Sequence, residues 1–255
     1  MVQRNAPVGV FDSGHGGISV LRELVRRMPW EDFLYFGDSA NAPYGPRTTE
    51  SVQQLTFAAA ERLLDAGCKA LVVACNTATA AAIDLLRQRY DQIPVVGIEP
   101  ALKPAVLEND HPHVLVMATE MTLREEKFHR QMESYQDRAE IYRLPAPGIV
   151  ESVEQGRVDG PELEAYLRDI LRPYETVPIT AVVLGCTHFP FVRGAIERCM
   201  GHPVTIYDGG PGTARETRRR LERADLLTDR TTPGRVELTN SRPEAVALSR
   251  RLLEL

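Results

Sequence analysis

The sequence predicts an α/β protein with two similar domains, each a mainly parallel sheet flanked by helices. Short apolar runs alternate with longer segments of helical period, and this alternation starts again after about residue 100. Two segments are also near copies of each other, residues 70–79 (ALVVACNTAT) and 181–190 (AVVLGCTHFP). Strands that alternate with helices are joined by crossovers and form parallel sheets covered by helices.

The first set of elements contains four predicted strands separated by three helices. Apolar runs predict strands at residues 8–11, 33–36, 70–74 and 95–98. Apolar residues at helical spacing predict helices from residue 18, over 48–66 and over 77–90.

The second set repeats this order. It predicts strands at 114–117, 141–144, 181–184 and 204–207, and helices at 123–135, 161–171 and about 191–200. A Gly/Pro-rich break is expected at residues 209–212, followed by a charged helix at 213–224, a strand at 236–239 and a last helix. We therefore expect a discontinuous first domain, residues 1–98 plus 210–255, and a second domain, residues 99–209.

Composition and charge exclude several classes of protein. The chain has 255 residues, 43% of them hydrophobic, which is enough to fill cores of this size. The net charge is −5, and Glu216 and Glu222 interrupt the Arg-rich segment 215–223, so no nucleic-acid partner is expected. Neither a signal peptide nor a membrane span is recognisable, which predicts a cytoplasmic protein with no membrane partner.

The four cysteines are expected to be free thiols. No C-x-x-C motif or Cys/His cluster at zinc spacing occurs, so neither a disulfide framework nor a metal site is predicted. Cys68 and Cys199 are expected to be small buried residues. Cys75 and Cys186 differ because each ends one copy of the repeated segment.

Candidate functional residues follow the predicted strands, since ligands of open parallel sheets bind beyond the carboxyl ends of the strands. These loops are polar or rich in glycine: residues 12–17 (DSGHGG), 38–45 (DSANAPYG), 75–77 (CNT), 118–122 (ATEMT) and 186–188 (CTH). The first loop partly matches a dinucleotide-binding motif, but its third glycine is missing and Asp12 would repel a pyrophosphate.

A thiol at a strand-to-helix junction has two possible roles. Cys186 beside His188 suggests the nucleophile and base of a cysteine hydrolase, but that scheme leaves Cys75 unused. Two equivalent thiols suit racemisation, in which one thiolate removes a proton and the opposing thiol donates one to the other face. No lysine lies in such a loop for a pyridoxal Schiff base, so no cofactor is expected.

Five segments, in order along the chain, are similar to glutamate racemases of the cofactor-independent aspartate/glutamate racemase superfamily: residues 8–17 (VGVFDSGHGG), 37–45 (GDSANAPYG), 71–79 (LVVACNTAT), 95–100 (VVGIEP) and 184–190 (LGCTHFP). The resemblance implies interconversion of L- and D-glutamate, a role in supplying D-glutamate for peptidoglycan, a homodimer, and an active site in the cleft between the two domains.

The resemblance also implies roles for individual residues. Cys75 matches the thiol that acts on D-glutamate, and Cys186 the thiol that acts on the L-enantiomer. Asp12 and His188 match auxiliary acid/base residues, which also contact the substrate. Residues that match positions holding the substrate's amino and carboxylate groups are Ser13, Tyr44, Gly45, Asn76, Thr77, Thr122 and Thr187.

A further catalytic glutamate is expected within residues 146–156 (APGIVESVEQG), which depart from the family pattern. Glu154 matches better by its distance to Gly156, although Glu151 also follows a valine. Asn41 stands where the family has an arginine, and His15 replaces an apolar residue.

Alternatives remain for several of these residues. Asp12 and Ser13 are also suitable caps for the first helix. Aspartate or a related acidic compound is the alternative substrate, and a cysteine hydrolase using Cys186 and His188 is the alternative enzyme class.

Overall fold

The computed structural model describes residues 3–108, 110–124 and 126–255, and the chain divides into two compact units. Unit 1 contains residues 1–99 and 210–255, and unit 2 contains residues 100–209. Each unit has one parallel sheet, of five strands in unit 1 and four in unit 2. The predicted α/β class is confirmed. The division into two domains, residues 1–98 plus 210–255 and residues 99–209, stays a prediction.

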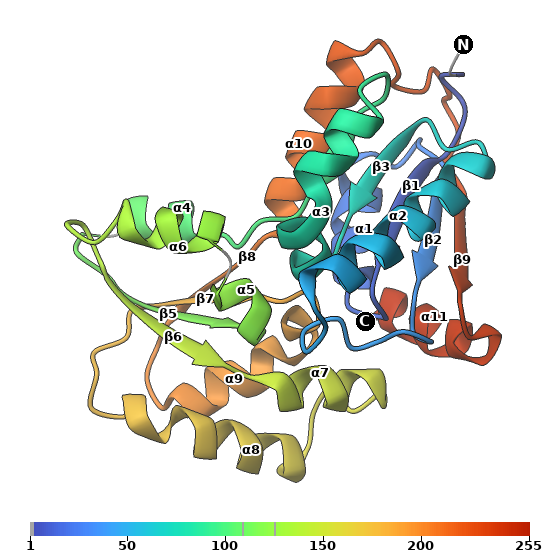
Figure 1. Cartoon of the computed structure of the whole chain (residues 1–255). Helices are drawn as coiled ribbons and strands as arrows, with labels where there is room; N and C mark the ends of the chain where they lie inside the picture. Colours follow the sequence, from blue (N-terminus) through green and yellow to red (C-terminus); the bar gives the residue numbers. More distant parts are fainter. Residues whose placement is uncertain (1–2, 109, 125) are drawn as a thin grey trace. The chain divides into compact units, whose positions relative to one another are not determined.

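Unit 1 is built around the strand order β4-β3-β1-β2-β9. Figure 1 labels β3, β1, β2 and β9 of this sheet. Its strands are β1 (Val8–Asp12), β2 (Phe33–Gly37), β3 (Ala70–Val73), β4 (Val95–Gly97) and β9 (Val236–Asn240). Its helices are α1 (Ile18–Arg27), α2 (Thr49–Asp65), α3 (Asn76–Arg89), α10 (Gly210–Arg223), α11 (Val246–Glu254) and the 3-10 turn η3 (Pro243–Ala245).

The connections of unit 1 place helices on both faces of its sheet. The chain passes from β1 to β2 in one direction and then back past β1 to β3, so right-handed crossovers put α1 and α2 on opposite faces. Accordingly, α1 packs against α10 and α11, while α2 packs against α3. Because both faces are covered, every residue of β1 is buried. Because β3, β1 and β2 are neighbouring parallel strands, the loops that follow them lie side by side at the carboxyl ends of the strands.

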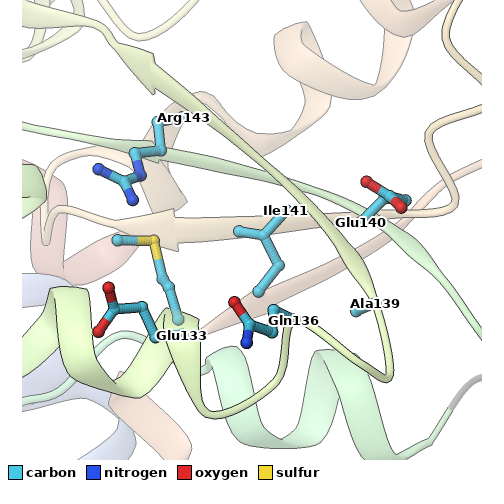
Figure 2. Close-up of a pocket in the computed structure, with 7 residues that line it drawn as sticks. Glu133, Gln136, Ala139, Glu140, Ile141 and Arg143 are labelled. Atoms are coloured by element: carbon cyan, nitrogen blue, oxygen red, sulfur yellow. The ribbon is translucent and has the colours of Figure 1, made fainter.

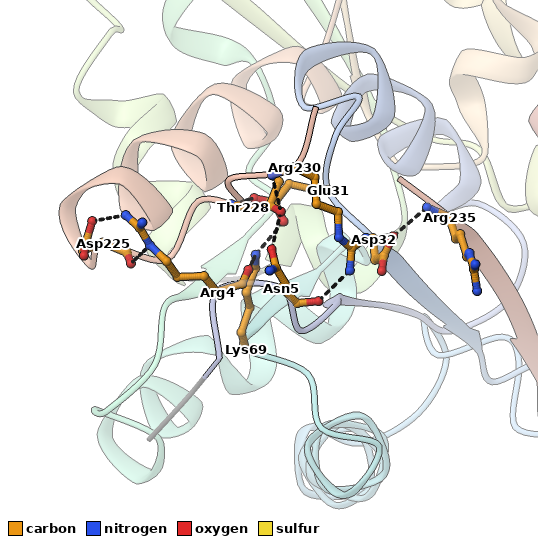
Figure 3. A network of polar contacts seen from close by, with 9 residues as sticks. All are labelled: Arg4, Asn5, Glu31, Asp32, Lys69, Asp225, Thr228, Arg230 and Arg235. Atoms are coloured by element: carbon orange, nitrogen blue, oxygen red, sulfur yellow. Dashed lines mark hydrogen bonds and ion pairs between the residues drawn. The ribbon is translucent and has the colours of Figure 1, made fainter. Parts of the chain in front are cut away.

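A polar network connects residues 225–235, which precede β9, to residues just before the start of β2 and β3, at the amino ends of these strands (Figure 3). Lys69 and Glu31, both buried, form an ion pair of 2.5 Å between Nζ and Oε2. Glu31 Oε1 also accepts a hydrogen bond from the backbone N–H of Thr228 at 2.7 Å, and Asp32 accepts one from that of Arg235 at 2.7 Å. These contacts lead directly into β9, which pairs in parallel with β2.

Unit 2 has the strand order β6-β5-β7-β8, again fully parallel. Its strands are β5 (His113–Ala118), β6 (Glu140–Pro145), β7 (Ala181–Gly185) and β8 (Thr205–Asp208). Its helices are α4 (Leu102–Leu107), α5 (Glu120–Arg124), α6 (Glu126–Glu133), α7 (Pro147–Glu154), α8 (Pro161–Leu171) and α9 (Arg193–Met200), with 3-10 turns η1 (Arg172–Tyr174) and η2 (Phe189–Val192). One core packs α4 and α6 against β5 and β7.

The helices differ from prediction at several points. The expected break at 209–212 is wrong, because α10 already begins at Gly210; Pro211 lies in its first turn, where the missing N–H has no helical partner to lose. Two helices, α4 and α7, were not predicted. The predicted 123–135 helix corresponds to α5 and α6, with residue 125 outside the described residues. Among the helices that the structure describes, none is long and apolar enough to cross a membrane.

Candidate active site

Cys75 lies between β3 and α3 in unit 1 and is the N-cap residue of that helix. Its Sγ accepts a hydrogen bond from the backbone N–H of Ala78 at 3.4 Å and lies 3.4 Å from Ser13 Oγ, to which the thiol donates. A helix N-terminus favours negative charge on the group that caps it. The backbone of α3 therefore provides a setting in which this buried sulfur can exist as a thiolate.

Asp12 ends β1 and is fully buried beside this thiol loop. Its Oδ2 accepts a hydrogen bond from the backbone N–H of Gly14 at 2.8 Å. A Cβ at residue 17 would lie 2.5 Å from the Cβ of Asp12, so the glycine at this position leaves room for the acid. Helix α1 begins at Ile18 with Gly17 as its N-cap and no side-chain capping bond, so the capping role considered for Asp12 and Ser13 is wrong.

Asn76 and Thr77 form the first turn of α3, and both are buried. Within the described part of the chain, neither Nδ2 nor Oδ1 of Asn76 has a hydrogen-bond partner. A buried amide left unsatisfied costs about 1–3 kcal/mol. Asn76 therefore presents both a donor and an acceptor beside Cys75, ready for a ligand.

Tyr44 is buried in the loop after β2, next to Gly45, and donates a hydrogen bond from its hydroxyl to Asp38 Oδ2 at 2.8 Å. Burial, followed by the charge and hydrogen bond of Asp38 and the charges of Cys75 and Asp12, raises the pKa of Tyr44 far above its ordinary value. Tyr44 therefore keeps its proton and is not suited to acid/base chemistry. Asp38 was not predicted as a site residue, although it begins the 38–45 loop.

Unit 2 contains a thiol, an imidazole and a carboxylate in a row. Cys186 directly follows β7, and its Sγ lies 3.6 Å from His188 Nδ1. His188 Nε2 lies 2.6 Å from Glu154 Oε1, at the end of α7. Cys186 and His188 are buried, whereas the Glu154 side chain is 20% exposed. Glu151, the other glutamate considered, lies on the exposed face of α7.

The charge state of His188 depends on these two neighbours. Burial alone disfavours the imidazolium, but the hydrogen bonds with Cys186 and Glu154 outweigh it and raise the pKa of His188 well above its usual value. These two neighbours therefore favour the protonated form of His188. It can stabilise a thiolate at Cys186 or give a proton to it.

The two cysteines thus have different surroundings despite their similar sequence context. Cys75 caps an α-helix of 14 residues, whereas Cys186 is followed by a turn and the 3-10 turn η2, and α9 begins only at Arg193. The sulfur of Cys75 thus contacts a backbone N–H at a helix start, whereas the sulfur of Cys186 contacts the imidazole of His188.

The remaining predicted residues also lie at the carboxyl edges of the sheets. Thr187, which stands between Cys186 and His188 in the sequence, is buried. Thr122 follows β5, the neighbour of β7, and its Oγ1 lies 3.0 Å from Oγ1 of Thr119. Thr119 was not singled out from the sequence, because a threonine before a helix is an ordinary capping residue.

A separate hollow of about 220 Å³ lies between α6 and the first residues of β6 (Figure 2). Met132 and Ile141 line it together with the charged residues Glu133, Glu140 and Arg143. None of the predicted site residues contributes to it. Across the described residues, no group of three His, Cys, Asp or Glu side chains could hold a metal ion.

Residues 9–217 match the family model described as Asp/Glu/Hydantoin racemase. The chain is also 49% identical to a glutamate racemase of Clostridium acetobutylicum over 257 residues, covering 100% of both chains. The chain belongs to the Asp/Glu/Hydantoin racemase family.

Solved structures of this racemase family share the fold. A glutamate racemase of Francisella tularensis in complex with D-glutamate aligns with a TM-score of 0.85 and 28% identity, covering 99% of this chain and 95% of that one. A glutamate racemase of Escherichia coli in complex with L-glutamate and activator UDP-MurNAc-Ala aligns with a TM-score of 0.84 and 28% identity, covering 97% and 95%.

Proposed function

We propose that the protein interconverts L- and D-glutamate without a cofactor and supplies D-glutamate for peptidoglycan. The observation that carries this proposal is the pair of buried cysteines, each within two residues of the end of an inner strand and each beside groups suited to stabilise a thiolate. A nucleophilic enzyme needs one such thiol, whereas proton transfer on two faces of one carbon needs two. Relatives of this length that act on glutamate support the choice of substrate.

In the proposed reaction from D-glutamate, the Cys75 thiolate removes the α-proton. The Cys186 thiol then donates its proton to the opposite face, leaving L-glutamate and a thiolate that the His188 imidazolium stabilises. The reverse direction begins at Cys186. The α-proton is a very weak acid, so preorganised donors must stabilise the carbanion-like state.

The polar groups near the thiols are suited to hold the substrate. Asn76 has a free donor and acceptor among the described residues, and Thr77 lies in the same helical turn. We assign the substrate's carboxylate and amino groups to these two residues together with Ser13, Tyr44, Gly45, Thr122 and Thr187. Asp12 and Glu154 serve as auxiliary acid/base groups for Cys75 and His188, respectively.

The test is racemisation of each glutamate enantiomer by the purified protein with no added cofactor, followed by circular dichroism. We expect conversion from both sides, and loss of full turnover in Cys75→Ser and in Cys186→Ser. No conversion of either enantiomer would rule out the proposal, and conversion of aspartate in its place would change the substrate. A cytoplasmic homodimer is proposed with this function, and light scattering measures its mass.

A second candidate, a cysteine hydrolase, is favoured by one observation: Cys186, His188 and Glu154 stand in the order of a nucleophile, its base and an orienting acid. That reaction predicts an acyl-enzyme burst that survives Cys75→Ser. The racemase predicts no burst and a requirement for both thiols.

A further inference from the structure

The loop that carries Tyr44 and Gly45 is shaped from within by Asp38. The carboxylate of Asp38 accepts hydrogen bonds from the Tyr44 hydroxyl at 2.8 Å and from Asn41 Nδ2 at 3.0 and 3.1 Å. The carbonyl of Asn41 in turn accepts one from Arg47 Nε at 2.9 Å. Residues 38–47, called the Tyr44 loop below, thus have a fixed internal hydrogen-bond pattern.

The end of the last strand anchors this loop to the sheet. Asn240, buried at the end of β9, donates from Nδ2 to Ser39 Oγ at 2.9 Å across 201 residues of sequence. Its neighbour Ser241 accepts a hydrogen bond at Oγ from the backbone N–H of Ala40 at 2.8 Å, and donates its own N–H to the carbonyl of Gly37 at 2.9 Å. Both side chains of 240–241 therefore bind the first residues of the Tyr44 loop.

The anchor is also tightly packed against the loop of Asp12. A Cβ at Gly37 would lie 2.4 Å from the carbonyl oxygen of Gly14 and 2.8 Å from Asn240 Nδ2. The hydroxyl of Tyr35 donates to the same Gly14 carbonyl at 2.8 Å. Three segments thus meet at Gly37, where no side chain fits.

The side chain of Asn240 satisfies donors and acceptors on two sides. Its Oδ1 accepts the backbone N–H of Arg242 at 2.9 Å while Nδ2 holds Ser39. A purely structural asparagine at a strand end needs only the first of these contacts, which closes the turn after β9. The second contact reaches into the loop that presents Tyr44.

We propose that Asn240 and Ser241 are positioning residues that hold the Tyr44 loop in its substrate-binding conformation. The inference rests on the proposed function, because Tyr44 and Gly45 are assigned to substrate there. When the anchor is lost, substrate binding must order the loop, and this ordering weakens binding rather than proton transfer.

The test measures KM and kcat for both glutamate enantiomers in Asn240→Ala and Ser241→Ala. Loss of the buried Asn240–Ser39 hydrogen bond corresponds to about a tenfold rise in KM in Asn240→Ala. The Ser241–Ala40 hydrogen bond is exposed, so water can replace it, and the rise in KM in Ser241→Ala is expected to be smaller. In both variants we expect kcat to change less than about twofold. Ser241 is exposed, so its variant stays folded if Asn240→Ala does not.

Thr239→Val is the matched control. Thr239 Oγ1 donates to the carbonyl of Tyr35 at 2.7 Å, so this variant also removes one hydrogen bond of β9 but none to the Tyr44 loop. Its KM is expected to stay at the wild-type value. Amide hydrogen exchange without substrate supplies a readout that is independent of activity, and residues 38–47 should exchange faster in Ser241→Ala than in Thr239→Val.

Two outcomes overturn the inference. One is a KM in the anchor variants no higher than in Thr239→Val, even if exchange in the loop is faster; the other is unchanged exchange in the loop. Absence of racemisation by the wild-type protein contradicts the proposed function instead, and the exchange experiment then still decides whether 240–241 anchor the loop.

Discussion

Glu154→Gln perturbs the contact between Glu154 and His188, the imidazole beside the Cys186 thiol. The substitution keeps the size of the side chain and its ability to accept a hydrogen bond, but removes the charge 2.6 Å from His188 Nε2. The pKa of His188 is raised by Cys186 and Glu154 against the opposing effect of burial. Without the carboxylate, burial has more influence and the pKa of His188 falls.

The size of the effect follows from the kind of bond that is weakened. A hydrogen bond to a charged group contributes about 1.5–3 kcal/mol, which corresponds to an approximately 10- to 150-fold change in the ratio of protonated to neutral His188 at a given pH. The imidazolium is the form that stabilises the Cys186 thiolate. Activity in the variant is therefore lost at lower pH than in the wild type.

The assay is the dependence of kcat on pH, followed by circular dichroism from L-glutamate and from D-glutamate, together with an NMR titration of His188. We expect the basic limb of the profile and the His188 titration to move to lower pH by the same amount. Glu151→Gln is the matched control, since it removes an exposed carboxylate from the same helix. Equal pH profiles for the two variants, or an unchanged His188 titration in Glu154→Gln, would refute the reasoning.

Three further predictions concern binding and stability. Asn76→Ala is expected to raise KM at least about tenfold, measured by steady-state kinetics. It is expected to lower the free energy of unfolding by less than about 1 kcal/mol, measured with denaturant, because the amide of Asn76 has no hydrogen-bond partner to lose among the described residues. Lys69→Met is expected to destabilise the protein by about 3–5 kcal/mol in urea, because it leaves the Glu31 carboxylate buried without its cation, while kcat/KM of the folded fraction stays unchanged. The third prediction concerns the pH dependence of stability. Because the pKa of His188 is higher in the folded than in the unfolded state, protonation of His188 stabilises the fold fully below about pH 6.5, and this stabilisation is lost as pH rises through the folded-state pKa. The difference in free energy of unfolding between the wild type and Glu154→Gln, measured in denaturant, should therefore shrink as pH rises.

Most strands were predictable from sequence because they contain a short apolar run, and β1, β3 and β7 are buried along their whole length because helices cover both faces of the sheet there. All nine predicted strands occur, and the cysteines lie at the predicted strand ends. Helix limits were less accessible: Gly210, Pro211 and Gly212 form the first turn of α10, where helical geometry tolerates them, although their composition is typical of a loop. Helix α7 has only eight residues and begins with proline and glycine, so its sequence lacks the long run of apolar residues at helical spacing that predicts a helix.

The site could be predicted only where chemistry is local in sequence. His188 is two residues from Cys186, so the pair was visible, whereas the contact of His188 with Glu154 depends on where α7 ends. Glu151 and Glu154 remained alternatives for that reason. The bond from Asn240 to Ser39 joins residues that are 201 apart and became visible only through the pairing of β9 with β2.

The central claim, that two thiols act on opposite faces of one carbon, is tested most directly by isotope distribution at early times. The wild-type protein is incubated with D-glutamate in heavy water, and the α-hydrogen of both enantiomers is followed by NMR before equilibrium. The account predicts that the first L-glutamate formed carries deuterium while the remaining D-glutamate keeps its protium, because the base that removes the proton does not deliver one to the product. The same pattern is expected from L-glutamate with the enantiomers exchanged. Deuterium entering the starting enantiomer as fast as the product, or protium transferred into the product, would contradict the two-thiol mechanism and favour a single base.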